Sequence, residues 1–234
     1  MLTVDFSKLE LKPGMKVLDA GCGLGRHVGE VFRREGIDVC AVDLRWDDLC
    51  RTKGLLFHMA AQKGGRWAVL QSDVLALPFR DAAFDVVICS EVLEHIKEGR
   101  RAVEEIVRIL KPGGELVVSV PRYLPERICW LLSRSYHEEP GGHVRIFRQR
   151  ELQRLLEDAG TACTAVRYKH ALHAPYWWLR CLVGHKNEGH PLVRLYREFL
   201  EWDIMTHPPL VRTLERLLDP LIAKSVVYYM KKGY

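Results

Sequence analysis

Hydrophobic residues in the first half of the chain gather in short runs, with longer amphipathic segments between them. The runs fall at residues 16–20, 38–42, 67–71, 84–89 and 115–120 and are rich in Val, Leu and Ile. Such runs are typical of strands that are buried on both faces of a sheet. Strands that alternate with helices over short connections are predicted to be parallel, with right-handed crossovers. The pattern therefore predicts an open sheet covered by helices on both faces.

The segment 100–110 has the clearest helical spacing in this half of the chain. Its apolar residues recur three and four positions apart, and its charged residues occupy the other face. The sequence Lys-Pro-Gly-Gly at 111–114 is predicted to end this helix, because Pro cannot continue it and Gly tolerates the turn. A second helix is predicted at 46–63, ending at Gly64 and Gly65.

After residue 120 the alternation gives way to a different pattern. Short helical segments are predicted here, at 122–134, 148–159, 191–203 and 209–218. A Gly-containing loop is predicted at 135–147, and strands at 161–170 and 224–232. The connection between those two strands is about 50 residues long, and a connection of that length is expected to be structured. We therefore expect one domain over 1–234, with a helical insertion at 171–221.

Composition fits an ordinary globular domain. Hydrophobic residues make up 48% of the chain and charged residues 28%, and the net charge of +5 does not by itself indicate nucleic acid or an anionic membrane. The seven cysteines are odd in number and lack C-x-x-C spacing, so reduced thiols are favoured over a disulfide scaffold. No signal-peptide pattern and no long apolar stretch is present, so a cytoplasmic location is expected. Nothing in the sequence specifies an oligomeric state.

The sequence "KVLDAGCGLGRH", from Lys16 to His27, places a glycine-rich loop directly after the first strand. Glycine permits positive φ and close approach of a ligand to the backbone. A dinucleotide fingerprint requires its third glycine at position 26, which is Arg26, and a P-loop requires a Gly-Lys-Ser or Gly-Lys-Thr that is absent. The loop therefore matches neither phosphate-binding motif.

The sequence "LDAGCGLG" instead resembles the first motif of the class I S-adenosylmethionine-dependent methyltransferases. The sequences "AVDL", "QSDVLALPF", "FDVVICSEVLEHI" and "LKPGGELVVSVP" resemble the family's next four motifs and come in the same order. The resemblance implies a Rossmann-like α/β fold with a seven-stranded, mostly parallel sheet and a C-terminal antiparallel strand. It also implies S-adenosylmethionine as cofactor.

Within this resemblance, three acidic residues have implied roles. Asp19 helps to hold the cofactor's ammonium group, Asp43 accepts hydrogen bonds from the ribose hydroxyls, and Asp73 meets the adenine amino group. The full set of expected cofactor-binding residues is Asp19, Gly21, Cys22, Gly23, Gly25, Asp43, Leu44, Asp73, Val74 and Ser90.

The sequence "SEVLEHI" after the fourth strand offers candidate catalytic groups. If it is helical, Glu91, Glu94 and His95 lie on one face. Some ubiquinone O-methyltransferases and small-RNA 2′-O-methyltransferases of this superfamily carry a similar E-x-x-E-H that binds a divalent metal, and these side chains could hold Mg²⁺ or Mn²⁺. The sequence favours the alternative, in which Glu91 lines the cofactor pocket and His95 caps or packs, because hard cations usually need more oxygen ligands. No metal ligand is therefore assigned.

Histidines further along the chain offer a general base or a second metal site. His143, in a loop expected to cover the acceptor, is the first candidate for the base because imidazole titrates near neutrality, and His137 is the second. The alternative, which the sequence favours for either residue, is a solvent-exposed loop histidine with no direct role. Arg145 could bind an anionic group on the acceptor. A zinc site is conceivable from four further residues, for which packing and solvent roles are favoured: His170, His173, Cys181 and His185.

The function that these features favour is methyl transfer to a small molecule with a hydroxyl group, apolar or linked to a lipid. The aromatic insertion would form a lid over this acceptor or a face for peripheral membrane contact. RNA or tRNA methylation is an alternative, although nucleic acid is not the expected partner because no RNA-binding motif or dense basic stripe is present. A non-catalytic, cofactor-binding scaffold is the third possibility.

Overall fold

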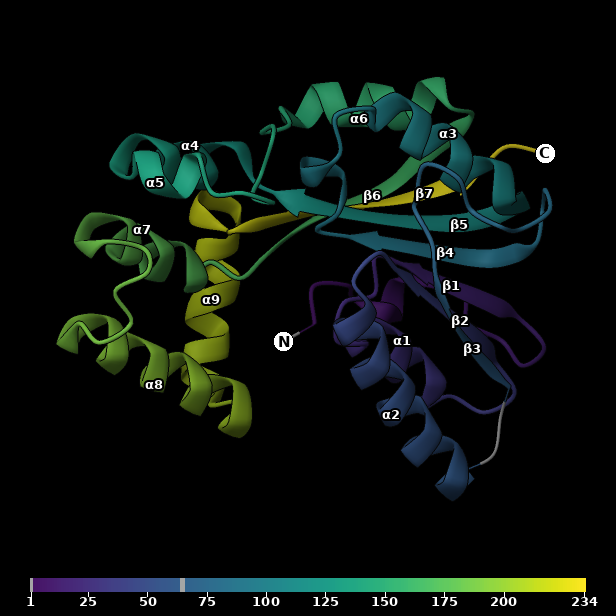
Figure 1. The fold of residues 1–234 in the computed structure, drawn as a ribbon, viewed down its shortest axis with the longest axis horizontal. Helices are drawn as coiled ribbons and strands as arrows, with labels where there is room; N and C mark the ends of the chain where they lie inside the picture. The colour runs from purple at the N-terminus through teal and green to yellow at the C-terminus, as the bar shows by residue number, and fades with distance from the viewer. Residues whose placement is uncertain (1, 64–65) are drawn as a thin grey trace.

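A seven-stranded sheet forms the centre of the computed structural model, which describes residues 2–63 and 66–234. The strands lie in the order β3-β2-β1-β4-β5-β7-β6 (Figure 1). Their bounds are β1 Lys16–Ala20, β2 Asp38–Asp43, β3 Trp67–Gln71, β4 Phe84–Ser90, β5 Leu110–Pro121, β6 Thr161–Lys169 and β7 Ser225–Lys232. β1 to β5 pair in parallel, whereas β7 runs antiparallel to both β5 and β6. The predicted Rossmann-like fold is confirmed.

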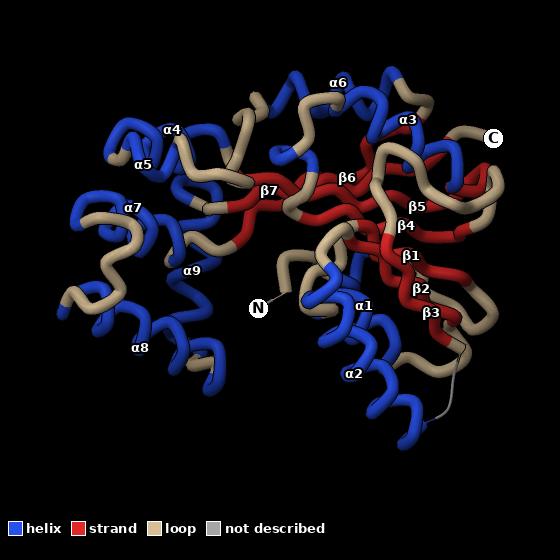
Figure 2. Tube along the Cα trace, viewed as in Figure 1, coloured by secondary structure: helices blue, strands red, loops and turns tan. Residues whose placement is uncertain are grey.

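Helices cover both faces of the sheet and its carboxyl edge (Figures 1 and 2). Their bounds are η1 Phe6–Lys8, α1 Arg26–Phe32, α2 Trp46–Lys63, η2 Leu93–His95, α3 Gly99–Ile109, α4 Tyr123–Leu132, α5 Arg134–His137, α6 Gln149–Asp158, α7 His173–Val183, α8 Pro191–Thr206 and α9 Pro209–Ile222. α1 and α2 lie on one face of the sheet, and α3 and α6 lie on the other.

Alternate residues of the central strands supply the two halves of the core. In β1, Val17 packs with α1 and α2, while its neighbour Leu18 packs with α3 and α6. Both side chains are almost fully buried. A strand that is covered on both faces must be apolar at consecutive positions, which is why its sequence is a continuous hydrophobic run rather than an alternation.

The boundary between α3 and β5 differs from the prediction. β5 already begins at Leu110, so the Lys-Pro-Gly-Gly segment lies inside the strand rather than after a longer helix. The pairing of β4 with β5 moves from Phe84–Leu110 directly to Val86–Glu115, which makes the extra residues a bulge. A bulge takes up residues that the partner strand does not match, and sequence periodicity does not reveal it.

Two other helix predictions change. The predicted helix at 122–134 is divided into α4 and the short α5, because Ser133 leaves the helical conformation and its side chain accepts a hydrogen bond from the Tyr136 amide. The predicted end of the earlier helix, at Gly64 and Gly65, lies outside the described residues.

The insertion between β6 and β7 consists of α7, α8 and α9. Together with α4 and α5, which follow β5, it lies past the carboxyl ends of the sheet (Figure 1). The Trp178 indole donates a hydrogen bond to the Pro125 carbonyl and so joins α7 to α4. The fully buried Asp203 pairs with Arg212 and joins α8 to α9. In the described part of the chain, no helix is both long and apolar enough to cross a membrane.

Candidate active site

A cavity of about 580 Å³ opens at the carboxyl ends of β1, β2 and β4, and we call it the strand-end cavity. In sheets of this kind, ligands bind at this edge, where the strand order reverses. Eight of the ten residues expected to bind the cofactor line it: Gly21, Cys22, Gly23, Asp43, Leu44, Asp73, Val74 and Ser90. Glu91 and His95 line it as well.

The glycines of the loop have different tasks. Gly21 has a φ of +79°, and a Cβ there would lie 2.2 Å from Val92 Cγ2, so this position must be glycine for the loop to pack. Gly23 has a φ of +49°, and a Cβ there would meet nothing within 4 Å. The bare backbone at Gly23 therefore leaves space in the cavity wall that a ligand can use.

Gly25 and Asp19 lie behind the loop and do not line the cavity. Gly25 is the N-cap of α1, with a φ of +76°, and a Cβ there would lie 2.8 Å from Thr52 Oγ1. Asp19 is 1% exposed, and its Oδ2 accepts a hydrogen bond from the Val28 amide. Burial raises the pKa of Asp19 to about 7. The structure therefore gives both residues a part in holding the loop against α1 and α2.

Asp43 and Asp73 present carboxylates along the cavity. Asp43 Oδ2 accepts from the Gly23 amide at 2.8 Å, and its Oδ1 accepts from the Arg45 amide at 2.9 Å. Asp73 Oδ1 accepts from the Leu75 amide at 2.9 Å. These bonds fix the orientation of each carboxylate and leave lone pairs for further donors.

This set of groups fits S-adenosylmethionine. The cofactor carries two ribose hydroxyls, an adenine amino group and an ammonium group, all hydrogen-bond donors, and the cavity offers carboxylate acceptors. The volume is within the usual range for small-molecule sites. When bound, the cofactor supplies an activated methyl group on a sulfonium.

Glu91 lies where β4 leaves the sheet, with a φ of +57°. Its Oε1 accepts from Ser119 Oγ at 2.9 Å, and Ser119 Oγ lies 2.8 Å from Ser90 Oγ. The prediction of a helix that aligns Glu91 with Glu94 and His95 is wrong, since the only helical residues here are the short turn η2, Leu93–His95. Glu91 points to the cavity, whereas Glu94 is 1% exposed.

Glu94, His95 and His143 form what we call the loop cluster, in which their ligand atoms lie within 4.8 Å of one another. Nε2 of each histidine lies 4.0 Å from Glu94 Oε1. Nδ1 of His95 lies 3.0 Å from the Gly141 carbonyl, and Nδ1 of His143 lies 2.6 Å from Glu126 Oε1. If both Nδ1 atoms donate to these oxygens, both Nε2 lone pairs face Glu94.

Neither oxygen of the Glu94 carboxylate has a hydrogen-bond partner in the described residues. Burial, followed by the Glu91 charge, raises the pKa of Glu94 well above its ordinary value. With both Nδ1 atoms as donors, three acceptors converge here without a donor among them. Such an arrangement requires a proton or a cation in its centre.

A second cavity, of about 440 Å³, adjoins the loop cluster on the side of the insertion. We call it the aromatic cavity, after Tyr136 and Trp177 in its lining. His143 lines this cavity rather than the strand-end cavity, and its ring centre lies 4.9 Å from that of His95. His137, the second candidate base, stacks on Trp130 instead, with 3.8 Å between ring centres.

Sequence reasoning missed Glu126 and Tyr136, which surround His143. Burial raises the pKa of Glu126, but the hydrogen bond from His143 and other favourable interactions outweigh it and hold the pKa below its ordinary value. Tyr136 donates to Glu126 Oε2 at 3.4 Å. The signal in the sequence was an acidic residue within a mostly apolar segment predicted to be helical.

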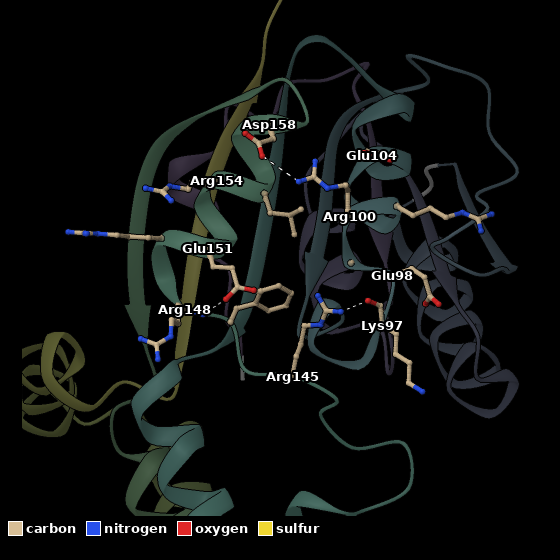
Figure 3. A pocket seen from close by; sticks show the side chains of 14 residues that line it. Lys97, Glu98, Arg100, Glu104, Arg145, Arg148, Glu151, Arg154 and Asp158 are labelled. Atoms are coloured by element: carbon tan, nitrogen blue, oxygen red, sulfur yellow. Dashed lines mark hydrogen bonds and ion pairs between the residues drawn. The ribbon is translucent and has the colours of Figure 1, made fainter.

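Arg145 lies in a different place from the expected acceptor site. It lines a groove of about 820 Å³ between α3 and α6, which we call the basic groove (Figure 3). Its guanidinium donates to the Lys97 carbonyl and lies over the Phe147 ring. The charged side chains of this groove are Lys97, Glu98, Arg100, Arg101, Glu104, Arg145, Arg148, Arg150, Glu151, Arg154 and Asp158.

The four residues considered for zinc separate into three places. His170 and His173 lie together at the end of β6 and the start of α7. Cys181 is buried at the other end of α7, and His185 lines the aromatic cavity, where its Nε2 lies 3.0 Å from Glu139 Oε2. These four residues therefore form no common site.

Known proteins share both the sequence pattern and the fold. The ubiquinone biosynthesis O-methyltransferase of Psychrobacter arcticus is 31% identical over 157 residues, which cover 63% of this chain and 59% of that protein. Probable tRNA methyltransferase 9B of Mus musculus is 38% identical over 114 residues, which cover 47% of this chain and 22% of that protein. The crystal structure of YcgJ from Bacillus subtilis has a TM-score of 0.61 at 20% identity, with 98% of this chain and 96% of that chain covered, and it supports the fold alone.

The curated relatives are matched over only part of their length, from 22% to 59%. Their acceptors are therefore not carried over to this chain by the match. The family itself is decided by a broader match, since the family model described as a methyltransferase domain covers residues 3–166. With the fold, the motif order and this match in agreement, the chain belongs to the class I S-adenosylmethionine-dependent methyltransferases.

Proposed function

We propose that the protein transfers a methyl group from S-adenosylmethionine to a hydroxyl of a small, apolar or lipid-linked acceptor. The observation that carries this proposal is the position of the loop cluster between two cavities. His95 lines the strand-end cavity and His143 lines the aromatic cavity. An acceptor held against Tyr136 and Trp177 would place its hydroxyl at the boundary between the two cavities. There it would lie beside both the methyl donor and an imidazole.

His143 is proposed as the general base. In this role its Nδ1–H group donates a hydrogen bond to Glu126. This bond fixes the ring and leaves Nε2 as the proton acceptor. As the hydroxyl attacks the methyl carbon, a new carbon–oxygen bond forms and the carbon–sulfur bond breaks. The hydroxyl proton passes to His143 Nε2, and Glu126 stabilises the imidazolium. The other products are the methyl ether and S-adenosylhomocysteine.

The loop cluster also supports a second arrangement, in which a divalent cation occupies it. Each histidine Nδ1 lies beside an oxygen, as is usual for metal-binding histidines, and Glu94 has no other partner in the described residues. A cation there would lower the pKa of an acceptor hydroxyl, and His143 would then act as a ligand and not as the base. Removal of metal with a chelator, with kcat measured at saturating acceptor, separates the two arrangements, because only the second loses kcat.

An apolar or lipid-linked acceptor is supported by the surface of the insertion. Leu210, Leu214, Leu217 and Leu221 of α9 recur at helical spacing and are all substantially exposed. On α7 and α8, further apolar residues form a shallow groove of about 390 Å³. Surfaces of this kind suit the boundary of a membrane, from which the insertion would act as a lid that delivers the acceptor.

RNA methylation is the second candidate function, favoured by the basic groove. Seven of the eleven charged side chains that line this groove are Lys or Arg. The similarity to a tRNA methyltransferase points the same way. The groove lies between α3 and α6 (Figure 3), however, whereas the aromatic cavity proposed for the acceptor is lined from α5 and α7 and the loops that follow them.

The test supplies the protein with S-adenosylmethionine labelled on the methyl group, together with a total lipid extract and total RNA. We expect label in the organic phase, with a fall of about 10²- to 10⁴-fold on His143→Ala. The matched control is His137→Ala, which removes a histidine outside both cavities and should retain activity. Label in RNA would favour the second function. Tight cofactor binding with no transfer at all would favour a scaffold.

A further inference from the structure

Two histidines and a glutamate from three elements meet at the junction of the sheet and the insertion. His170 follows β6, His173 begins α7, and Glu215 lies in the middle of α9. Their ligand atoms lie within 4.8 Å of one another, and we call them the insertion cluster. These elements come together at the end of the sheet that faces the insertion (Figure 1).

The donor atoms of this cluster are buried and unused. His170 Nε2, His173 Nδ1 and Glu215 Oε1 have no hydrogen-bond partner among the described residues. His170 is 7% exposed and Glu215 is 8% exposed, so water does not readily replace the missing partners. An unpaired polar atom in such a place destabilises the fold, and packing alone does not account for three at one point.

Hydrogen bonds hold the backbone that carries the two histidines. The His173 amide donates to the His170 carbonyl at 3.1 Å, and the Ala171 amide donates to Asp219 Oδ1 of α9 at 3.0 Å. The Tyr196 hydroxyl of α8 donates to the Leu172 carbonyl at 3.0 Å. The backbone that carries the two imidazoles is therefore fixed before any ligand arrives, which lowers the entropic cost of binding one.

The charged groups around the cluster are of both signs. Arg212 donates to Glu215 Oε2 at 2.8 Å and also pairs with the buried Asp203, so its charge is matched by two carboxylates. The Lys224 ammonium lies 5.1 Å from the centre of the Trp177 ring. The carboxylate of Asp219 faces the same turn.

We propose that His170, His173 and Glu215 bind a divalent transition-metal ion that joins the insertion to the end of the sheet. Two imidazole nitrogens and one carboxylate oxygen are a ligand set that Zn²⁺ favours, with a fourth position for water or a neighbouring group. The ion would link β6, α7 and α9. Since the cluster lies outside both cavities of the active site, this inference does not depend on the proposed function.

The experiment measures Zn²⁺ binding by calorimetry and by metal analysis after dialysis. It uses the His143→Ala protein, because this substitution removes one candidate ligand from the loop cluster and weakens any metal binding there. We expect about one ion per chain. Adding His173→Gln or Glu215→Gln should reduce the affinity at least tenfold, because each removes a ligand. His190→Gln is the matched control, since His190 also belongs to the insertion and has an unpartnered Nδ1 outside the cluster.

Failure to bind Zn²⁺ in the His143→Ala protein would overturn the proposal, as would binding that His173→Gln and Glu215→Gln leave unchanged. Circular dichroism establishes whether each variant is folded. If the ligand variants do not fold, Co²⁺ decides the matter in the His143→Ala protein. Intense visible bands of tetrahedral Co²⁺ that Zn²⁺ displaces support the site, and their absence refutes it.

Discussion

Replacement of Asp43 by Ala tests the assignment of the cofactor site most directly. Asp43 is the last residue of β2, lines the strand-end cavity, and is held by the amides of Gly23 and Arg45. The matched control is Asp38→Ala at the first residue of the same strand. Asp38 pairs with the exposed Arg66 at the opposite edge of the sheet.

The expected loss follows from the hydrogen bonds that the Asp43 carboxylate can accept. A hydrogen bond to a charged acceptor contributes about 1.5 to 3 kcal/mol, so two ribose hydroxyls would lose about 3 kcal/mol or more. Since 1.4 kcal/mol is a factor of about ten, the Kd should rise at least about 100-fold. The amides of Gly23 and Arg45 also lose their acceptor, and a fall of about 1 to 2 kcal/mol in the free energy of unfolding is expected.

Calorimetry with S-adenosylhomocysteine measures this affinity without turnover. Asp43→Asn should fall between wild type and Asp43→Ala, because the amide oxygen retains one acceptor but no charge. Asp38→Ala should leave the Kd within about threefold of wild type, since an exposed ion pair contributes little. A folded Asp43→Ala protein with unchanged affinity would refute the cofactor assignment at β2.

Four further substitutions test the loop and the insertion. Gly21→Ala forces a Cβ against Val92 and should lower the free energy of unfolding by about 1 to 3 kcal/mol in denaturant titrations, whereas Gly23→Ala should mainly weaken cofactor binding. Asp19→Asn should stabilise the cofactor-free protein at pH 8 but not at pH 4. The folded-state pKa of Asp19 is raised from 3.8 to about 7, so its ionisation costs stability as the pH rises through this interval, by at most about 4 kcal/mol. Equal effects of Asp19→Asn at the two pH values would contradict this account. Arg212→Ala leaves a fully buried carboxylate of α8 unpaired and should cost about 3 to 5 kcal/mol in thermal unfolding, and a loss below about 1 kcal/mol would contradict the pairing.

The central fold could be predicted because its evidence is local. A strand such as β1 must be apolar at consecutive positions to be covered on both faces, and the glycine loop needs positive φ at fixed positions. Both constraints act within about ten residues of chain. The bulge in β5 depends on its register with β4, and the break at Ser133 depends on a capping bond from the Tyr136 amide that the apolar periodicity does not show; the prediction placed both boundaries wrongly.

The candidate catalytic groups also divide into those that a local pattern suggested and those that only the folded chain brings together. The sequence brought Glu91, Glu94 and His95 together by assuming a helix, but the chain makes only one short turn there. His143 joins Glu94 and His95 only because the loop after α5 folds back over that turn, where the Val144 amide donates to the Glu94 carbonyl at 2.9 Å. A contact between residues almost fifty positions apart leaves no periodic trace in the sequence.

The insertion cluster and the proposed acceptor site are connected through α7, which gives a final prediction. His173 is the first residue of this helix, and Trp177, one turn later, lines the aromatic cavity. Trp178 fastens the same helix to α4, which carries Glu126. An ion at His173 would therefore fix the wall against which the acceptor packs, while the cofactor residues on β1 and β2 would be unaffected. His173→Gln is expected to raise the KM for the acceptor and to leave the Kd for S-adenosylhomocysteine unchanged, and added Zn²⁺ should lower the KM of wild type alone. A change in cofactor affinity of the same size would show that the substitution disturbs the whole fold, and the proposed link through α7 would then be wrong.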